Sequence, residues 1–247
     1  MKLIYTKKEV NKMDNYLQKL NINENLKKEI NSYRENYPVS HELLYRIPKP
    51  DNLYYGDEIW NQAVTALLCG ENILLVGHKA TGKNIFAENL AAVFGRPAWD
   101  ISFHVNMDAS SLIGTDTFRN GKVEFRPGPV YSCACNGGFG IFDEINMARN
   151  EALAVLHSAL DFRRVIDVPG YERITLADDT RFIATMNYNY AGTRELNEAL
   201  ASRFVVIRMP ALTLEDLQRL LREQFPDLSS KYNKQFGLHF YGYPEKM

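Results

Sequence analysis

Two short motifs constrain the fold of this chain more than any other feature of its sequence. The first is Gly77–Asn84 (GHKATGKN), which follows an apolar run and precedes a helical pattern. Its two glycines let the backbone turn N–H groups toward phosphate oxygens at the start of a helix. The second is Gly140–Glu144 (GIFDE), an apolar strand that ends in two carboxylates. Because either motif alone is a weaker signal, their combination is what predicts a nucleotide site on a phosphate-loop fold.

Each polar residue of these motifs has a predicted task. Lys83 reaches the β- and γ-phosphates of a bound nucleotide. Of the two carboxylates Asp143 and Glu144, one suits a Mg²⁺ ligand and the other a general base that acts on the attacking water. Asn84 stands where Ser or Thr usually offers a hydroxyl to the metal, and its amide oxygen is also a neutral ligand. This departure bears on the expected hydrolysis rate more than on the binding of ATP or ADP.

Composition argues against several other classes of function. The net charge of −1 disfavours a dedicated nucleic-acid surface. No apolar run approaches the roughly 18 residues of a membrane span, and the N-terminal residues lack the apolar stretch of a signal peptide. The cysteines Cys69, Cys133 and Cys135 are too sparse for a disulfide framework or a zinc site. We therefore expect a cytoplasmic protein with reduced thiols and no membrane partner.

Apolar runs that alternate with helical patterns predict the fold class from residue 54 onward. Helical patterns cover 57–68 and 85–94, and apolar runs bounded by helices are typical of buried parallel strands. The predicted strands are 72–76, 98–103, 139–143, 181–186 and 204–209. Two hairpin insertions are predicted at 115–125 and 165–176. The expected architecture is an α/β phosphate-loop fold with a five-stranded parallel sheet, flanking helices and hairpins that face a partner or substrate.

The chain divides into three predicted segments. Residues 1–50 form an N-terminal helical extension and linker, residues 51–210 the nucleotide-binding core, and residues 211–247 a partial helical lid. The first segment carries two amphipathic patterns, over Val10–Leu20 and Leu26–Tyr37, which predict short helices. These helices either pack on the core or dock a partner, and the sequence leaves both interpretations open.

Two residues near the ends of later strands are further candidates. Asn187 follows a predicted parallel strand, at the edge where ligands bind, and there it could orient the attacking water or touch the γ-phosphate. Leu196, Leu200 and Arg203 have the spacing of one helix, with Arg203 at its end. The Arg203 guanidinium either serves the γ-phosphate of a neighbouring subunit or makes a surface salt bridge.

These residues together resemble the AAA+ ATPases of the MoxR and dynein-related branch. The resemblance rests on Gly77–Asn84, Asp143–Asn146 (DEIN), Asn187 and Ala201–Phe204 (ASRF), and DEIN is particularly characteristic. The run Leu160–Arg164 (LDFRR) is similar to the CbbQ/NorQ group within that branch. Segment 108–129 is similar to the family's insertion ahead of its acidic strand. The resemblance covers roughly residues 54–210.

The resemblance implies a role for each site residue. Asn187 corresponds to sensor 1, Arg203 to the arginine finger, and Arg194 to a second basic residue near the same interface. Tyr55 and Gly56 stand where the family lines the adenine pocket. The implied nucleotide-binding set is Tyr55, Gly56, Gly77, His78, Lys79, Ala80, Thr81, Gly82, Lys83, Asn84 and Ile85. The implied catalytic residues are Lys83, Glu144, Asn187 and Arg203, and the implied ligands of Mg²⁺ are Asn84 and Asp143.

The resemblance also implies partners. Family members assemble with themselves as rings, usually hexamers, and act with a von Willebrand factor A-type protein that carries a metal-ion adhesion site. Their work is the remodelling of client enzymes or the insertion of metal cofactors into them, and the client of this chain is not readable from the sequence.

One part of the family pattern looks incomplete. Relatives follow the finger with a helical lid that bears a second sensor arginine, whereas here only 212–225 predicts a helix, and Arg219 and Arg222 are poor substitutes. Three functions stay open: an ATPase that remodels a partner, a nucleotide-gated binding module with little turnover, and a small-molecule phosphate-loop kinase. The paired acids and Arg203 favour the first, because a kinase needs an acceptor pocket rather than an inter-subunit finger.

Overall fold

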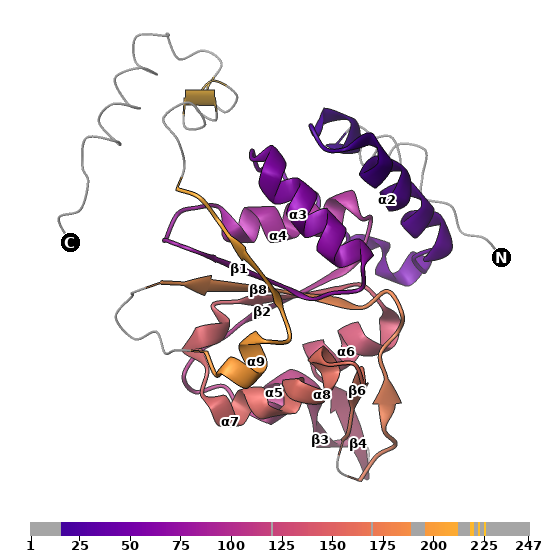
Figure 1. The fold of residues 1–247 in the computed structure, drawn as a ribbon. Coiled ribbons are helices and arrows are strands. Elements are labelled where there is room, and N and C mark those ends of the chain that lie inside the picture. The colour runs from indigo at the N-terminus through magenta and orange to yellow at the C-terminus, as the bar shows by residue number, and fades with distance from the viewer. Residues whose placement is uncertain are drawn as a thin grey trace. The chain divides into compact units, whose positions relative to one another are not determined.

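A five-stranded sheet lies at the centre of the computed structural model, with the strand order β2-β5-β8-β1-β9 (Figure 1). The strands are β1 Ile73–Gly77, β2 Ala98–Ser102, β5 Phe139–Asp143, β8 Arg181–Asn187 and β9 Val205–Arg208. Every neighbouring pair is parallel. The carboxyl ends of β1, β5 and β8 therefore meet at one edge of the sheet. This confirms the predicted fold class, and each predicted strand is present with small shifts at its ends.

The structure describes residues 16–119, 121–168, 170–188, 196–211, 218, 219, 222 and 225. It divides into two compact units, Met1–Met209 and Pro210–Met247. Arg194, the first amphipathic pattern up to residue 15, and most of the helix predicted over 212–225 lie outside the described residues.

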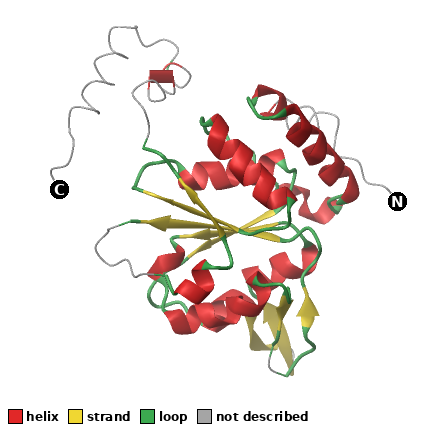
Figure 2. Ribbon diagram, viewed as in Figure 1, coloured by secondary structure: helices red, strands yellow, loops and turns green. Residues whose placement is uncertain are grey.

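Helices cover both faces of the sheet (Figures 1 and 2). One face carries α2 Glu24–Asn36, α3 Asp57–Leu68 and α4 Lys83–Val93. The other carries α5 Ala109–Ile113, α6 Pro129–Asn136, α7 Asn150–Leu153, α8 His157–Leu160 and α9 Glu198–Ala201. Short 3-10 helices span His41–Arg46, Ile145–Met147 and Ala154–Leu156. No helix in the described ranges combines the length and the apolar character that crossing a bilayer requires.

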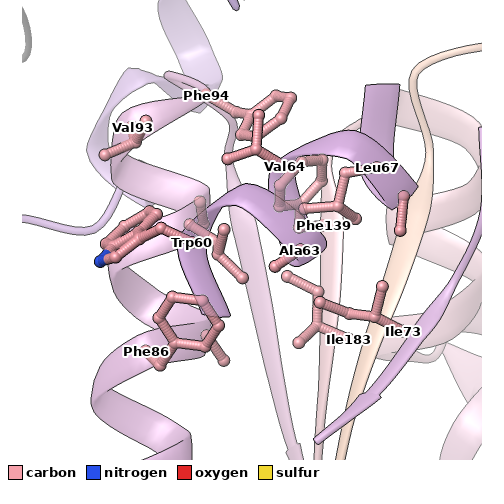
Figure 3. Close-up of a cluster of buried hydrophobic side chains, with 14 of the residues drawn as sticks. Trp60, Ala63, Val64, Leu67, Ile73, Phe86, Val93, Phe94, Phe139 and Ile183 are labelled. Atoms are coloured by element: carbon pink, nitrogen blue, oxygen red, sulfur yellow. The ribbon is translucent and has the colours of Figure 1, made fainter. Parts of the chain in front are cut away.

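Successive side chains along a strand point to opposite faces of the sheet, so the core consists of two clusters, one on each face. On β1, Ile73 and Leu75 face one cluster, while Leu74 and Val76 face the other. This follows from the period of two in a β-strand, and a strand buried on both faces is apolar throughout. The cluster under α3 and α4 is drawn in Figure 3, where Trp60 lies close to Phe86; their rings meet edge to face, 4.9 Å apart.

The N-terminal segment packs with the sheet's helices. Ile30 of α2 is fully buried in the cluster that also holds α3 and α4. Tyr33 donates a hydrogen bond to the carbonyl oxygen of Asp179 at 3.0 Å, and Arg34 Nε donates to that of Val93 at 2.9 Å. Of the two interpretations of this segment, the structure supports packing on the core for the residues from 16 onward.

The two insertions form hairpins that touch each other. The first comprises β3 Gly114–Arg119 and β4 Lys122–Pro127, and the second β6 Val165–Ile166 and β7 Ile174–Thr175. Tyr171 of the second hairpin donates to Asp116 Oδ1 of the first at 2.5 Å, and its ring lies 4.9 Å from that of Phe125. At the tip of the first hairpin, Phe118 lies opposite Val123 and is 77% exposed.

The helix expected before the last strand is shorter than the spacing suggested. Asn197 caps α9 by accepting a hydrogen bond from the Ala199 N–H at 2.8 Å, which fixes the helix start after Leu196. The helix ends at Ala201, so Arg203 follows it rather than lying on its last turn. The prediction that Leu196, Leu200 and Arg203 share one helix was therefore wrong for the first and last of them.

Candidate functional site

The phosphate loop joins the end of β1 to the first turn of α4. Ala80 and Gly82 have positive φ angles of 60° and 77°, the left-handed region that glycine adopts at least cost. A β-carbon on Gly77 would lie 3.0 Å from the Met209 carbonyl oxygen, so a side chain there would crowd the neighbouring strand. Since α4 begins at Lys83, its unpaired N–H groups and the positive end of its dipole face the loop. The loop thus presents backbone donors suited to a phosphate.

Lys83 lies inside the loop. Its side chain is 7% exposed, and Nζ donates to the carbonyl oxygens of Gly77 at 3.1 Å and His78 at 2.6 Å. Burial lowers the pKa of Lys83, while the nearby carboxylates of Glu144 and Asp143 raise it. The ammonium is therefore held by the loop carbonyl oxygens, where a phosphate bound by the loop would meet it, and the two acids are near enough to act on it electrostatically.

The segment before α3 lies beside the loop and includes the predicted adenine-pocket residues Tyr55 and Gly56. A β-carbon on Gly82 would lie 3.2 Å from the Tyr54 ring. Asn89 of α4 holds this segment by accepting a hydrogen bond from the Tyr54 N–H at 3.0 Å. The structure thus brings the segment next to the phosphate loop and adds Tyr54 to it, a residue that the sequence motifs did not single out.

The two acids stand at the carboxyl end of β5, beside β8. Glu144 adopts a left-handed conformation, with φ 53° and ψ 49°. Its N–H donates to Thr185 Oγ1 at 3.0 Å, and the same hydroxyl donates to Asp143 Oδ1 at 2.9 Å. Thr185 was visible in the sequence as part of a strand end, but no pattern assigned it a role.

Asn187 contacts the predicted general base directly. Its Nδ2 donates to Glu144 Oε1 at 2.8 Å. Asn146 in turn donates from Nδ2 to the Asn187 carbonyl oxygen at 3.3 Å, and its buried Oδ1 has no hydrogen-bond partner. Side chains from the ends of β5 and β8 therefore connect the two strands where the chemistry is expected.

Asn84 and Asp143 are the residues that would supply protein oxygen ligands to a Mg²⁺ ion shared with nucleotide phosphates. Asn84 is exposed on the first turn of α4, and Asp143 is partly exposed with one oxygen bonded to Thr185. Both supply the hard oxygen ligands that Mg²⁺ prefers. In the described part of the chain no group of three or more His, Cys, Asp or Glu could form an all-protein cage. Mg²⁺ commonly binds one or two carboxylates together with phosphates and water, and Asp143 would be such a carboxylate.

Arg203 is fixed by contacts within its own chain. Its Nε donates to the His157 carbonyl oxygen at 3.2 Å, and Nη2 lies 3.5 Å from Asp161 Oδ2. Nη1 also donates to the Ala199 carbonyl oxygen. Hydrogen bonds from Arg163 lower the pKa of Asp161 to about 2, so this carboxylate stays ionised beside both guanidinium groups. Arg203 keeps 23% of its side chain exposed and is held in one orientation after α9.

The family model of the AAA domain (dynein-related subfamily) matches residues 72–204, which is more than half of the chain. The chain belongs to this family. The match runs from β1 to the residue after Arg203, so it includes the phosphate loop, the acid pair and Asn187. Nucleotide binding is expected of this family, and the phosphate loop, the acid pair and Asn187 of this AAA domain are arranged for it.

Bacterial relatives of this AAA domain share most of its length. The uncharacterized protein YojN of Bacillus subtilis (strain 168) is 36% identical over 86% of this chain and 71% of its own length. An uncharacterized protein of Staphylococcus saprophyticus is 36% identical over 68% of this chain and 66% of its own length. The chain thus spans about two thirds of the length of these relatives. The crystal structure of a proposed ATPase from Cytophaga hutchinsonii shares the fold, with a TM-score of 0.55 and 19% identity over 92% of this chain and 61% of that chain.

Proposed function

We propose that this chain hydrolyses ATP in a Mg²⁺-dependent manner and uses the cycle to remodel or activate a protein partner. The observation that carries the proposal is the 2.8 Å hydrogen bond from Asn187 Nδ2 to Glu144 Oε1, next to the Lys83 ammonium. A cation for phosphates, a carboxylate for water and an amide that orients the carboxylate are the groups that nucleotide hydrolysis needs. Membership in the dynein-related AAA family supports ATP as the nucleotide.

In the proposed mechanism the protein positions the reactants and supplies one proton acceptor. The loop N–H groups and Lys83 hold the β- and γ-phosphates. Asn187 fixes Glu144 Oε1, which leaves the other carboxylate oxygen to accept a proton from the attacking water. Mg²⁺, held by Asp143 and Asn84, would neutralise charge on the phosphate oxygens.

We extend the proposal to a ring of identical chains, a hexamer as in the MoxR branch. Arg203 then serves the nucleotide of a neighbouring copy, and its partly exposed, firmly held guanidinium supports this role. The LDFRR run supports the CbbQ/NorQ group, and with it a von Willebrand factor A-type partner and a client enzyme. The exposed hairpin tip at Phe118 is the surface that we expect to meet such a partner.

One observation favours a second candidate, a nucleotide-gated binding module with little turnover. Asn84 replaces the hydroxyl residue that commonly binds the metal, and its carboxamide group is bulkier than a hydroxyl group at that point. In that case ATP binding alone would change the partner-binding surface, and hydrolysis would only reset it slowly.

Phosphate release from ATP, measured with Mg²⁺ or EDTA over a wide range of protein concentration, tests the proposal. We expect Mg²⁺-dependent release whose specific rate rises with protein concentration, together with an ATP-dependent increase in mass by light scattering. Tight ATP binding with negligible release would favour the binding module. A chain that binds no nucleotide would overturn both.

A further inference from the structure

Thr185 occupies the point where the backbone pairing of two central strands stops. The parallel register between β5 and β8 ends at Phe142 and Ala184. Beyond that pair Asp143, the last residue of β5, and Glu144, which follows it, lie beside the end of β8, and Thr185 is the next residue on β8. The residue is 1% exposed, so its hydroxyl must find partners within the protein.

The direction of both hydrogen bonds at Thr185 follows from the chemistry of the groups. The Glu144 N–H can only donate, so the hydroxyl oxygen accepts from it at 3.0 Å. An ionised Asp143 carboxylate can only accept, so the hydroxyl proton goes to Oδ1 at 2.9 Å. One hydroxyl therefore sets the orientation of the predicted metal ligand and fixes the backbone of the predicted base.

The bond to the backbone matters because Glu144 is left-handed. A residue with a β-carbon seldom adopts φ 53°, and such a conformation persists only when its surroundings hold it. Thr185 holds the N–H of Glu144, and Asn187 holds its Oε1 at 2.8 Å. Without the Thr185 hydroxyl the backbone could relax, and the carboxylate would turn away from the position that Asn187 gives it.

We propose that Thr185 is a positioning residue for hydrolysis, which acts through Asp143 and Glu144 without touching the nucleotide. This inference rests on the proposed ATPase function and deepens it. Residues that orient metal ligands and catalytic groups typically change metal affinity or activity by roughly 10–100-fold when they are removed. The effect falls on turnover and on the Mg²⁺ dependence of binding, whereas the affinity for nucleotide without metal depends on the phosphate loop.

The chain offers a matched set of variants for the test. Thr185→Val removes the hydroxyl at nearly constant volume, and Thr185→Ser restores it. Thr180→Val removes another fully buried hydroxyl, which donates to the Cys133 carbonyl oxygen at 3.4 Å just before the same strand. We expect Thr185→Val to lower kcat by roughly 10–100-fold and to lose most of the Mg²⁺-dependent gain in affinity for a fluorescent ATP analogue. Its affinity in EDTA should change less than about threefold, and Thr180→Val should change neither quantity.

Rescue by serine separates positioning from a general packing defect. Thr185→Ser should retain most of the turnover, because it keeps the hydroxyl and loses only a methyl group. A Thr185→Val protein with wild-type kcat and Mg²⁺ dependence would overturn the proposal. So would a Thr185→Ser protein as slow as the valine variant, since the hydroxyl would then not be the cause.

A readout without nucleotide keeps this inference distinct from the proposed function. Hydrogen exchange at the Glu144 amide should be faster in Thr185→Val than in wild type or Thr180→Val, because its acceptor is gone. If the wild type neither bound nor hydrolysed ATP, the proposed function would be wrong. Exchange would still decide whether Thr185 holds Glu144, and unchanged exchange in Thr185→Val would overturn that assignment.

Discussion

Lys83 is a buried charge of the phosphate loop, and both acids, Asp143 and Glu144, act on it electrostatically. Its Nζ already sits within 2.6 Å of a loop carbonyl oxygen, so a bound phosphate needs little movement of the side chain to gain a charge-assisted hydrogen bond. Lys83→Ala should weaken the binding of a fluorescent ATP analogue by about 10–100-fold, the loss expected for one hydrogen bond to a charged group. Lys122→Ala, on the exposed hairpin, is the control for the loss of a positive charge and should bind normally. Equal affinity in the two variants would contradict the assignment of Lys83.

Glu144 should affect turnover far more than binding. Glu144→Gln keeps an oxygen that can accept the Asn187 hydrogen bond but loses the basic carboxylate. We expect ATP binding to persist and kcat to fall by roughly 10²-fold or more, the usual contribution of a general base. Glu151→Gln removes an exposed carboxylate on α7 and serves as the control in the same phosphate-release assay. If wild type hydrolyses ATP and Glu144→Gln keeps pace with it, another group is the base.

At this scale the sequence predicts some site residues and not others, and the reason is physical. Lys83 and Glu144 lie in local motifs that can be recognised from their neighbours along the chain alone. Tyr54 and Thr185 matter through neighbours in space, beside the Gly82 backbone and between the two acids. Their contacts depend on the strand order and on how a loop returns to α4, and no local pattern contains that information.

Among elements, the strands were predictable because a strand covered on both faces is largely apolar, as β1 and β5 are. The start of α9 was not, because the capping role of Asn197 depends on a side-chain rotation that spacing does not reveal. Likewise the periodicity of α2 shows that it has an apolar face, but it does not show what covers that face. The structure answers this by placing Ile30 in the main cluster with α3 and α4.

The packing of α2 makes the N-terminal segment part of the stability of the core. Ile30→Ala deletes a fully buried side chain and should destabilise the whole domain by about 2–4 kcal/mol, the range for large-to-small changes in a core. Lys28→Ala, on the exposed side of the same helix, should cost less than about 0.5 kcal/mol. Urea unfolding followed by the fluorescence of the two buried tryptophans, Trp60 and Trp99, measures both. A midpoint unchanged by Ile30→Ala would mean that α2 folds and unfolds apart from the core.

At the scale of the whole molecule, Arg203 decides whether the site is complete in one chain. The Arg203 guanidinium contacts Asp161 and His157 of its own chain. These contacts fix the direction of the side chain but use only part of its five N–H donors. A structural salt bridge at a partly exposed position would contribute little to stability. An arginine held ready for a neighbour's nucleotide would be needed for hydrolysis and dispensable for binding.

We therefore expect Arg203→Ala to bind the ATP analogue normally and to hydrolyse ATP about 10³-fold more slowly, near the lower end of the range for arginine fingers. Arg163→Ala is the control. It also removes a guanidinium that contacts Asp161, but the Arg163 side chain is more exposed than that of Arg203. The decisive experiment mixes Arg203→Ala with Lys83→Ala. Each variant lacks a different half of a shared site, so mixed assemblies contain interfaces in which an intact phosphate loop meets an intact Arg203. Phosphate release in the mixture above the sum of the separate variants would support action between copies. A mixture no faster than that sum, from a wild type that is active as a monomer at every concentration, would place Arg203 in the site of its own chain.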